Sequence, residues 1–383
     1  MGTRNPADAP LALTARMGLT DYWNDSCAVG ELAYAIERGA CGATSNPSIV
    51  VEVLGKEREH WESRVLELAD LNPTWSELDL TWEIYEEMAA RGAATLLPVY
   101  QRSGARKGWQ SIQTNPANYR DPVRMVEQGA RFSSLAPNLQ VKFPATRAGI
   151  VAIEDALARG INPNATVSFT LSQVIASAEA AERGLDRLAD AGGDPDRLAP
   201  ISTVMMGRLD DWLKAVVEHD GLSVDPGALN WAGIAVMKRA YAIFSERGYR
   251  SRLLGAAYRH HLHWTEIAGG DLSMTIPHAW QVRFNSSGIV PVPRIDEPVD
   301  GYILSELSRI RDFRRAYELD GLAPEEFDGY GASVRTLRSF IGATHDLTAA
   351  MREIVLPDPD HKPAAAAAAR REPATPQLAS RGR

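Results

Sequence analysis

Short apolar runs recur along the chain, and the segments between them carry apolar residues at helical spacing. This alternation is typical of repeated strand and helix units in a parallel sheet. The strand-like runs end near eight positions, which are Asp25, Ser45, Ile112, Phe143, Phe169, Met205, Tyr258 and Ile276. Eight such runs predict an α/β fold of the (β/α)₈ TIM barrel type.

The barrel is expected to form a single domain over residues 16–356, because α/β barrels often exceed the usual domain size as one unit. Residues 51–107, between the second and third strands, have helical spacing and predict a helical insertion. Residues 1–15 are expected to be a flexible N-terminal segment. Residues 357–383 contain little that could be buried, which predicts a disordered C-terminal tail.

Charge and composition exclude several classes of function. A formal net charge of −8 argues against sequence-independent binding of nucleic acid. No apolar run approaches the ~18 residues needed to span a membrane, and residues 1–17 lack the apolar core of a secretory signal. The two cysteines fit a reducing compartment. We therefore expect a cytoplasmic protein with Cys27 and Cys41 packed, although Cys27 lies close enough to the candidate site to be reactive.

Lys142 stands in the middle of the apolar run Leu139–Pro144. Burial disfavours the ammonium form and can lower a lysine pKa from roughly 10.4 toward 7–8. A free amine can then attack a ketone and form a Schiff base. The simpler interpretation is a strand-end lysine whose stem packs while its head reaches water, and Lys142 taken alone favours it.

Other polar residues also follow the predicted strands, and in a barrel such residues converge at one mouth. They comprise one carboxylate and several amides and hydroxyls: Asp25, Thr44, Asn46, Gln113, Asn164, Thr166 and Thr203. Together with the Lys142 amine, this set suits chemistry on a carbonyl intermediate. It requires no metal or cofactor.

Several segments resemble the transaldolase family. Residues 42–49, Gly-Ala-Thr-Ser-Asn-Pro-Ser-Ile, resemble the family signature, and residues 141–146, Val-Lys-Phe-Pro-Ala-Thr, resemble its Schiff-base lysine segment. Asp25 resembles the first-strand aspartate, and residues 160–166 resemble the stretch that carries an asparagine and a water-binding threonine. Gly207-Arg208 and residues 255–259 resemble segments that bind substrate phosphate. The similarity extends from about residue 18 to 350, with specific motifs up to Pro277.

The resemblance implies an enzyme of the class I aldolase superfamily that uses sugar phosphates, as in the pentose phosphate pathway. Lys142 would attack the ketone of a ketose phosphate, and Asp25 would remove the C4 hydroxyl proton so that the C3–C4 bond breaks. The dihydroxyacetone unit left on Lys142 would then attack an acceptor aldehyde. Thr166 would hold the water used to form and hydrolyse the imine. The remaining implied substrate contacts are Thr44, Asn46, Asn164, Thr203, Arg208 and Arg259.

Some positions depart from the family pattern. Gln113 stands where transaldolases usually carry a glutamate. A glutamine at this position resembles the fructose-6-phosphate aldolase branch of the superfamily. A glutamate can move a proton through bound water, whereas a glutamine can only hold that water. In the phosphate pocket, Thr203 and Ala257 replace serines and Met205 replaces a phenylalanine. The sequence therefore leaves open the acceptor and the balance between transfer and free cleavage.

Other interpretations remain for individual motifs. Asp25 could be the N-cap of a helix over residues 28–36, and a Thr-Ser-Asn-Pro segment is often an Asx turn. The histidines at 260, 261 and 263 suggest a metal site. No carboxylate or thiolate partner is evident nearby in the sequence, which favours a solvent-facing or hydrogen-bonded loop.

Two other functions stay open. One is an aldolase that releases or takes up free dihydroxyacetone, or joins it to a specialised acceptor, which Gln113 favours. The other is a catalytically silent barrel that binds a sugar phosphate, which the retention of Lys142 and Asp25 disfavours. The oligomeric state, including a homodimer, is not determined by the sequence.

Overall fold

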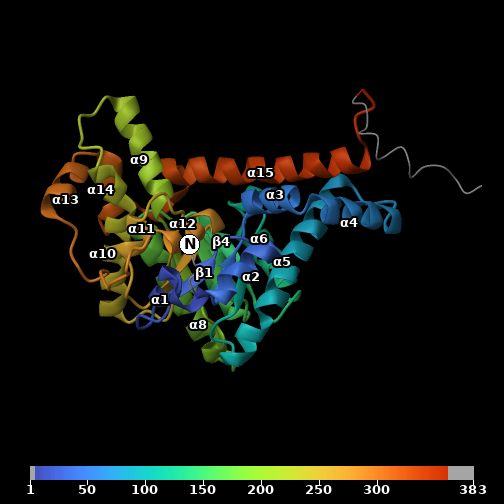
Figure 1. Cartoon of the computed structure of the whole chain (residues 1–383), viewed down its shortest axis with the longest axis horizontal. Coiled ribbons are helices and arrows are strands. Elements are labelled where there is room, and N and C mark those ends of the chain that lie inside the picture. The colour runs from blue at the N-terminus through green and yellow to red at the C-terminus, as the bar shows by residue number, and fades with distance from the viewer. Residues whose placement is uncertain (1–4, 361–383) are drawn as a thin grey trace, which may run out of the picture.

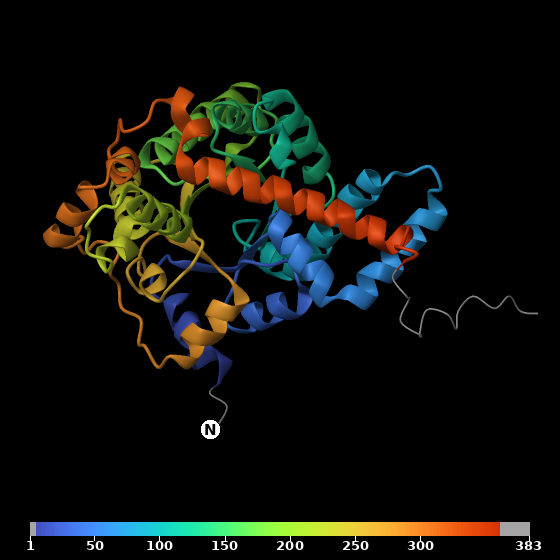
Figure 2. The same cartoon turned by 90° about the horizontal axis from the view of Figure 1, so that it is seen from above.

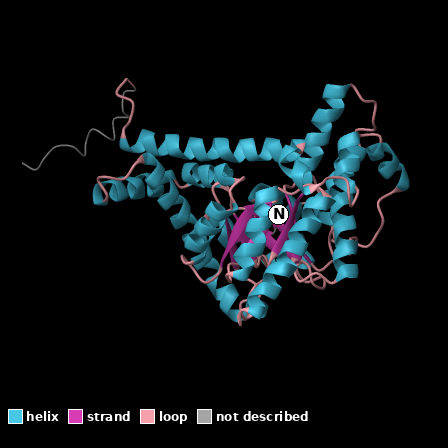
Figure 3. Ribbon diagram, turned by 180° about the vertical axis from the view of Figure 1, so that it is seen from behind, coloured by secondary structure: helices cyan, strands magenta, loops and turns pink. Residues whose placement is uncertain are grey.

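The computed structural model describes residues 5–360, and their eight strands form one closed parallel barrel. The strands are β1 (Asp21–Asn24), β2 (Gly42–Thr44), β3 (Trp109–Gln113), β4 (Leu139–Pro144), β5 (Pro163–Thr166), β6 (Ile201–Met205), β7 (Arg252–Ala256) and β8 (Leu272–Ile276). Each strand pairs with the next along the chain, and β8 pairs with β1 to close the barrel. Helices surround these strands (Figure 3). The predicted (β/α)₈ fold is confirmed.

Fifteen α-helices lie in the described part of the chain. They are α1 (Pro10–Thr14), α2 (Val29–Glu37), α3 (Pro47–Lys56), α4 (Arg58–Leu71), α5 (Glu77–Arg102), α6 (Pro122–Ser133), α7 (Arg147–Ala158), α8 (Leu171–Asp190), α9 (Met206–Asp220), α10 (Ala232–Arg247), α11 (Leu262–Thr265), α12 (His278–Ser286), α13 (Gly301–Ser308), α14 (Arg311–Tyr317) and α15 (Gly331–Val355). The expected helical insertion between β2 and β3 consists of α3, α4 and α5. Apolar side chains such as Trp61, Val65 and Ile84 bury its inner face.

The long helix α15 crosses over one end of the barrel (Figures 1 and 2). It packs on α3, α4 and α5 toward one end and on α9 toward the other. Arg352 binds Glu77 of α5 through two hydrogen bonds of 2.8 and 2.6 Å. The insertion therefore supports a helix that covers the mouth of the barrel.

Two predicted strand ends lie two to three residues beyond the true ends. β5 ends at Thr166 rather than near Phe169, and β7 ends at Ala256 rather than near Tyr258. The next residue has a positive φ in both cases, 51° at Val167 and 64° at Ala257. Such a backbone turns the chain out of the strand, and an L residue rarely adopts it. Valine and alanine give no turn signal, which explains the error.

Residues 10–14, within the predicted flexible N-terminal segment, form α1, and the flexibility of that segment stays a prediction. The side chain of Leu11 is fully buried, and Trp264 Nε1 donates a 3.0 Å hydrogen bond to Thr14 Oγ1. The predicted disordered tail falls mostly on residues 361–383, outside the described residues. Among residues 5–360, no helix combines the length and hydrophobicity needed to cross a membrane.

Candidate active site

A cavity of about 220 Å³ opens at the carboxyl ends of the strands. It is lined by residues from β1, β4 to β8 and the loops that follow them, together with α3. Seven of the ten predicted site residues line it: Asp25, Asn46, Lys142, Thr166, Thr203, Arg208 and Arg259. The other three, Thr44, Gln113 and Asn164, do not line it. The structure thus brings residues that are far apart in sequence to one mouth.

Lys142 lies in β4 with only 6% of its surface exposed. Its Nζ donates one hydrogen bond, of 3.1 Å, to the carbonyl oxygen of Ser45. Burial lowers the pKa of the Lys142 amine to about 8, against an opposing effect of the Asp25 carboxylate. At neutral pH roughly a tenth of the molecules then carry a free amine at this position. The buried-amine interpretation of the sequence fits this environment, and the simpler water-facing interpretation does not.

Asp25 follows β1 directly and is only partly exposed. Thr44 Oγ1 donates a 2.6 Å hydrogen bond to its Oδ1. Burial raises the pKa of the Asp25 carboxyl, while the Lys142 charge and the Thr44 hydrogen bond oppose that increase. The alternative role of Asp25 as a helix N-cap is wrong, because α2 begins at Val29 and its N-cap is Ala28.

The side chain of Asn46 both caps a helix and lines the cavity. It is the N-cap of α3, where its Oδ1 accepts a 3.1 Å hydrogen bond from the backbone N–H of Ile49. The same side chain lines the cavity. Capping uses only the amide oxygen, which leaves the Nδ2 group available to donate to a ligand. Because this bond reaches three residues along the chain, Asn46 forms a helix N-cap rather than the Asx turn expected from the sequence, and its substrate contact stays a prediction.

The barrel interior below Lys142 is polar. Thr203 Oγ1 donates to Asn164 Oδ1 at 2.7 Å, Asn164 Nδ2 donates to Ser111 Oγ at 3.1 Å, and Ser111 Oγ donates to Gln140 Oε1 at 2.9 Å. Asn164 pairs in register with Lys142 on the neighbouring strand. These hydrogen bonds hold the polar side chains of the barrel interior next to Lys142 in fixed orientations.

Gln113 pairs in register with Lys142 from the other side, on β3. Its Oε1 is buried and has no hydrogen-bond partner among the described residues. Burying an acceptor without a donor costs free energy, so a water or a substrate hydroxyl would be stabilised there. Thr166, the predicted water-binding residue, places its Oγ1 3.9 Å from Met205 Sδ.

Two arginines lie at one side of the cavity. Arg208, in α9, is half-buried, and its guanidinium lies 4.9 Å from the centre of the Phe340 ring of α15. Burial and the nearby charge of Arg259 both lower the pKa of Arg208. Arg259 is exposed and forms an ion pair of 2.9 Å with Asp211. Two cations that line the same cavity favour an anion between them.

A buried Asp210–His263 pair supports the loop that carries Arg259, and no motif in the sequence indicates this pair. The Arg259 backbone N–H donates to His263 Nδ1 at 3.1 Å, and His263 Nε2 lies 2.8 Å from Asp210 Oδ2. Since His263 Nδ1 accepts, its Nε2 carries the proton and donates to Asp210. Burial lowers the pKa of His263, although the Asp210 hydrogen bond opposes this, so the imidazole is neutral at pH 7.

The absence of a carboxylate near the histidines, inferred from the sequence, is therefore wrong. Ligand atoms of Asp210, His260 and His263 lie within 4.8 Å of one another. Both ring nitrogens of His263 are already used in hydrogen bonds, which argues against a metal site. The hydrogen-bonded interpretation is confirmed for His263, which is fully buried and not solvent-facing.

Both cysteines are free and buried. Burial raises the pKa of the Cys27 thiol to about 12 and also raises that of Cys41. The thiolate is the reactive form of cysteine, so neither residue has the environment of a nucleophile. Both are packing residues.

The chain is similar to several known proteins. The transaldolase/fructose-6-phosphate aldolase family matches the chain over residues 22–310. A transaldolase of Thiobacillus denitrificans is 28% identical over 319 residues, which span 77% of this chain and 86% of that protein. A transaldolase of Mycobacterium marinum is 29% identical over 251 residues, with shares of 64% and 66%. Transaldolase 2 of a Nostoc species is 30% identical over 188 residues, with shares of 47% and 48%.

Proposed function

The chain belongs to the transaldolase/fructose-6-phosphate aldolase family, and we propose that it transfers a dihydroxyacetone unit from a ketose phosphate to an aldose acceptor through a Schiff base on Lys142. The observation that carries this proposal is a buried amine, with a pKa of about 8, that shares the mouth of the barrel with the half-buried carboxylate of Asp25. Sugar phosphates fit the family and the arginine pair at the cavity. The proposed active domain is the barrel over residues 16–356.

In the first step, neutral Lys142 Nζ attacks the ketone carbon of the donor. Loss of water gives the protonated imine, which withdraws electrons from the C3–C4 bond. The buried acceptor of Gln113 and the hydroxyl of Thr166 are suited to hold the water that leaves here and returns in the last step. Neither group needs to ionise for that role.

In the second step, the Asp25 carboxylate takes the proton of the C4 hydroxyl, and the C3–C4 bond breaks to release an aldose. The electron pair of that bond forms an enamine on Lys142. Thr44 donates to Asp25 and favours its ionised form, which is the form that acts as a base. In the reverse direction the enamine attacks the acceptor aldehyde, and Asp25 returns the proton to its oxygen.

Arg208 and Arg259 would bind the substrate phosphate. Arg208 makes no ion pair within residues 5–360, and Arg259 pairs only with the half-exposed Asp211. A phosphate would therefore add charge-assisted hydrogen bonds without first breaking a buried pair. Asn46 and Asn164 would orient the hydroxyls, with Asn164 acting together with Thr203.

Gln113 favours the second candidate, an aldolase that releases dihydroxyacetone, because it cannot shuttle a proton. We favour transfer because the chain, with its helical insertion, resembles the long transaldolases. The match to the Thiobacillus denitrificans transaldolase also extends over most of both proteins. Transfer requires an enamine that persists until an acceptor binds, and α15, which crosses over the mouth (Figure 2), is placed to limit the access of water to it.

Borohydride trapping tests the covalent step. Fructose 6-phosphate followed by borohydride should add a three-carbon unit to the peptide that contains Lys142. Lys142→Arg should abolish labelling, because a guanidinium stays protonated. Lys238→Arg is the matched control: Lys238 is also buried, but its Nζ is bound by the carbonyl oxygens of Arg294 and Glu297, so labelling should persist. Labelling at another lysine, or none with any ketose, would contradict the proposal, and the second result would favour a silent sugar-phosphate-binding barrel.

A further inference from the structure

A second cavity, of about 370 Å³, lies at the opposite end of the barrel from the proposed active site. Its lining includes the first residues of four strands: Asp21 of β1, Trp109 of β3, Ile201 of β6 and Arg252 of β7. The loop after α5 and the segment before β6 complete its wall. The active-site residues of β1 and β7, by contrast, follow the ends of those strands. The two cavities are therefore separate.

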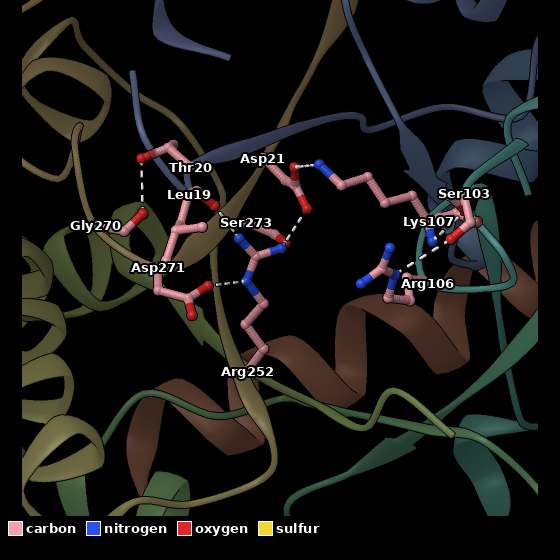
Figure 4. Close-up of polar contacts among 10 residues, drawn as sticks. All are labelled: Leu19, Thr20, Asp21, Ser103, Arg106, Lys107, Arg252, Gly270, Asp271 and Ser273. Atoms are coloured by element: carbon pink, nitrogen blue, oxygen red, sulfur yellow. Dashed lines mark hydrogen bonds and ion pairs between the residues drawn. The ribbon is translucent and has the colours of Figure 1, made fainter. Parts of the chain in front are cut away.

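Part of the charge in this cavity is used to hold the barrel together. Lys107 Nζ binds Asp21 Oδ1 at 2.6 Å, and Arg252 binds the other oxygen of Asp21 as well as Asp271, the latter at 2.7 Å. Figure 4 shows Lys107 and Arg252 each reaching a different carboxylate oxygen of Asp21. Arg252 also donates to the carbonyl oxygen of Leu19. These groups are neutralised by one another and join the starts of β1, β7 and β8.

Two further arginines are not neutralised. Arg106 donates only to the carbonyl oxygen of Ser103, at 3.3 Å, and its guanidinium points toward Arg252 across the opening (Figure 4). Arg197 makes no side-chain hydrogen bond or ion pair within residues 5–360. Five cationic side chains line the cavity (Arg106, Lys107, Arg197, Arg250 and Arg252). Three of them are already paired: Arg250 with Glu182 and Asp186, and Lys107 and Arg252 with Asp21 and Asp271. The positive charge left for a ligand is therefore that of Arg106 and Arg197.

Two buried indoles add hydrogen-bond donors without acceptors. Trp23 and Trp109 both line the cavity and are each only 4% exposed. Neither Nε1–H has a hydrogen-bond partner in the described part of the chain. The indole of Trp23 packs directly against the backbone of Gly42, and a Cβ at that position would lie only 2.5 Å from the ring. Because an unpaired buried N–H costs free energy, both positions favour a ligand with acceptor oxygens.

The remaining wall is apolar. Leu185, Leu198 and Ile201 line it, together with Pro195 and Pro200. An inorganic ion would leave this surface in contact with water. A ligand with an apolar body would bury it and gain hydrophobic free energy.

We propose that this cavity binds a small organic anion, with a phosphate or carboxylate group held by Arg106, Arg197 and the two indole N–H groups, and an apolar body on the leucine and proline wall. The fork of each guanidinium matches two oxygens of either group. The site takes no part in the proposed reaction, because it lies at the other end of the barrel.

Calorimetric titration with phenyl phosphate and with benzoate tests the proposal and separates the two head groups. The protein carries Arg208→Ala and Arg259→Ala, so that binding at the other mouth does not contribute. One of the two compounds should bind with a stoichiometry of one. Adding Arg106→Ala and Arg197→Ala should weaken binding at least about tenfold, since two charge-assisted contacts are lost. The matched control, Arg311→Ala with Arg338→Ala, removes the same charge from exposed arginines outside the cavity and should leave the affinity unchanged.

The indole ¹H–¹⁵N resonances of Trp23 and Trp109 give a second readout. Both should move when the ligand binds, and each is assigned by its loss in a Trp→Phe variant. Absence of binding by both compounds, or equal weakening in the control variant, would overturn the site. Equal affinity for inorganic phosphate and phenyl phosphate would overturn the role of the apolar wall.

Discussion

The hydrogen bond from Thr44 to Asp25 should set the acid limb of the pH profile. Thr44 has a single hydroxyl proton, and its Oγ1 lies 2.6 Å from Asp25 Oδ1 and 2.5 Å from Thr275 Oγ1. If the Thr44 hydroxyl donates its hydrogen bond to Asp25, then Thr44 must accept the hydrogen bond of the Thr275 hydroxyl. Thr44→Val keeps the shape of the side chain and removes the only side-chain hydrogen bond to Asp25 within residues 5–360.

The size of the effect follows from the charge on the acceptor. A hydrogen bond to an ionised group contributes about 1.5–3 kcal/mol, and about 1.36 kcal/mol corresponds to one pH unit. Removing the bond disfavours the carboxylate, and Asp25 must be ionised to act as a base. The acid limb of kcat/KM for ketose cleavage should therefore move to higher pH by about one to two units.

Thr275→Val is the matched control. It removes the hydroxyl that donates to Thr44 but keeps the hydrogen bond that Thr44 donates to Asp25. The acid limb should therefore move far less. The assay is kcat/KM for fructose 6-phosphate over pH 4–9, with circular dichroism to confirm that both variants are folded. An unchanged acid limb in Thr44→Val, or an equal movement in both variants, would refute the role assigned to this bond.

Three further predictions follow from the site. Only the neutral amine of Lys142 attacks the ketone, and its pKa is lowered to about 8, so the rate of borohydride-trapped imine formation should rise with pH and level off above about 8; a flat rate between pH 6.5 and 9 would contradict this. Arg208→Ala should raise KM for fructose 6-phosphate at least about tenfold and leave KM for an unphosphorylated ketose nearly unchanged, whereas equal losses on both substrates would indicate a structural role. His263→Leu should lower the free energy of unfolding in urea by about 1.5–3 kcal/mol, because Asp210 loses its closest side-chain donor. His260 lies 3.5 Å from Asp210, so His260→Leu should lower that free energy less. Equal effects of the two substitutions would refute this assignment.

The sequence predicted the barrel and most of its mouth because the strands carry local signals. The eight strands recur at intervals along the chain, and polar residues such as Asp25, Gln113 and Lys142 stand within them or directly after them. Val167 and Ala257 show the limit of this approach, since their positive φ angles depend on the packing around them. Gly207 shows the same dependence: a Cβ there would lie 2.0 Å from the carbonyl oxygen of Ala257.

Contacts between distant segments could not be predicted. Asp210 and His263 are 53 residues apart, and neither stands in a motif that indicates the other. The position of α15 over the mouth depends on the insertion that supports it, through contacts such as Arg352 with Glu77. The unpartnered indoles of Trp23 and Trp109 likewise become visible only once the barrel has closed, because their isolation is a property of their surroundings.

Product analysis tests the central claim most directly. The protein is incubated with fructose 6-phosphate, with and without erythrose 4-phosphate, and the products are separated and quantified. The proposed transfer predicts sedoheptulose 7-phosphate in the presence of the acceptor and no free dihydroxyacetone, and Gln113→Glu should then raise the transfer rate. Release of free dihydroxyacetone whether or not the acceptor is present would contradict transfer and establish an aldolase.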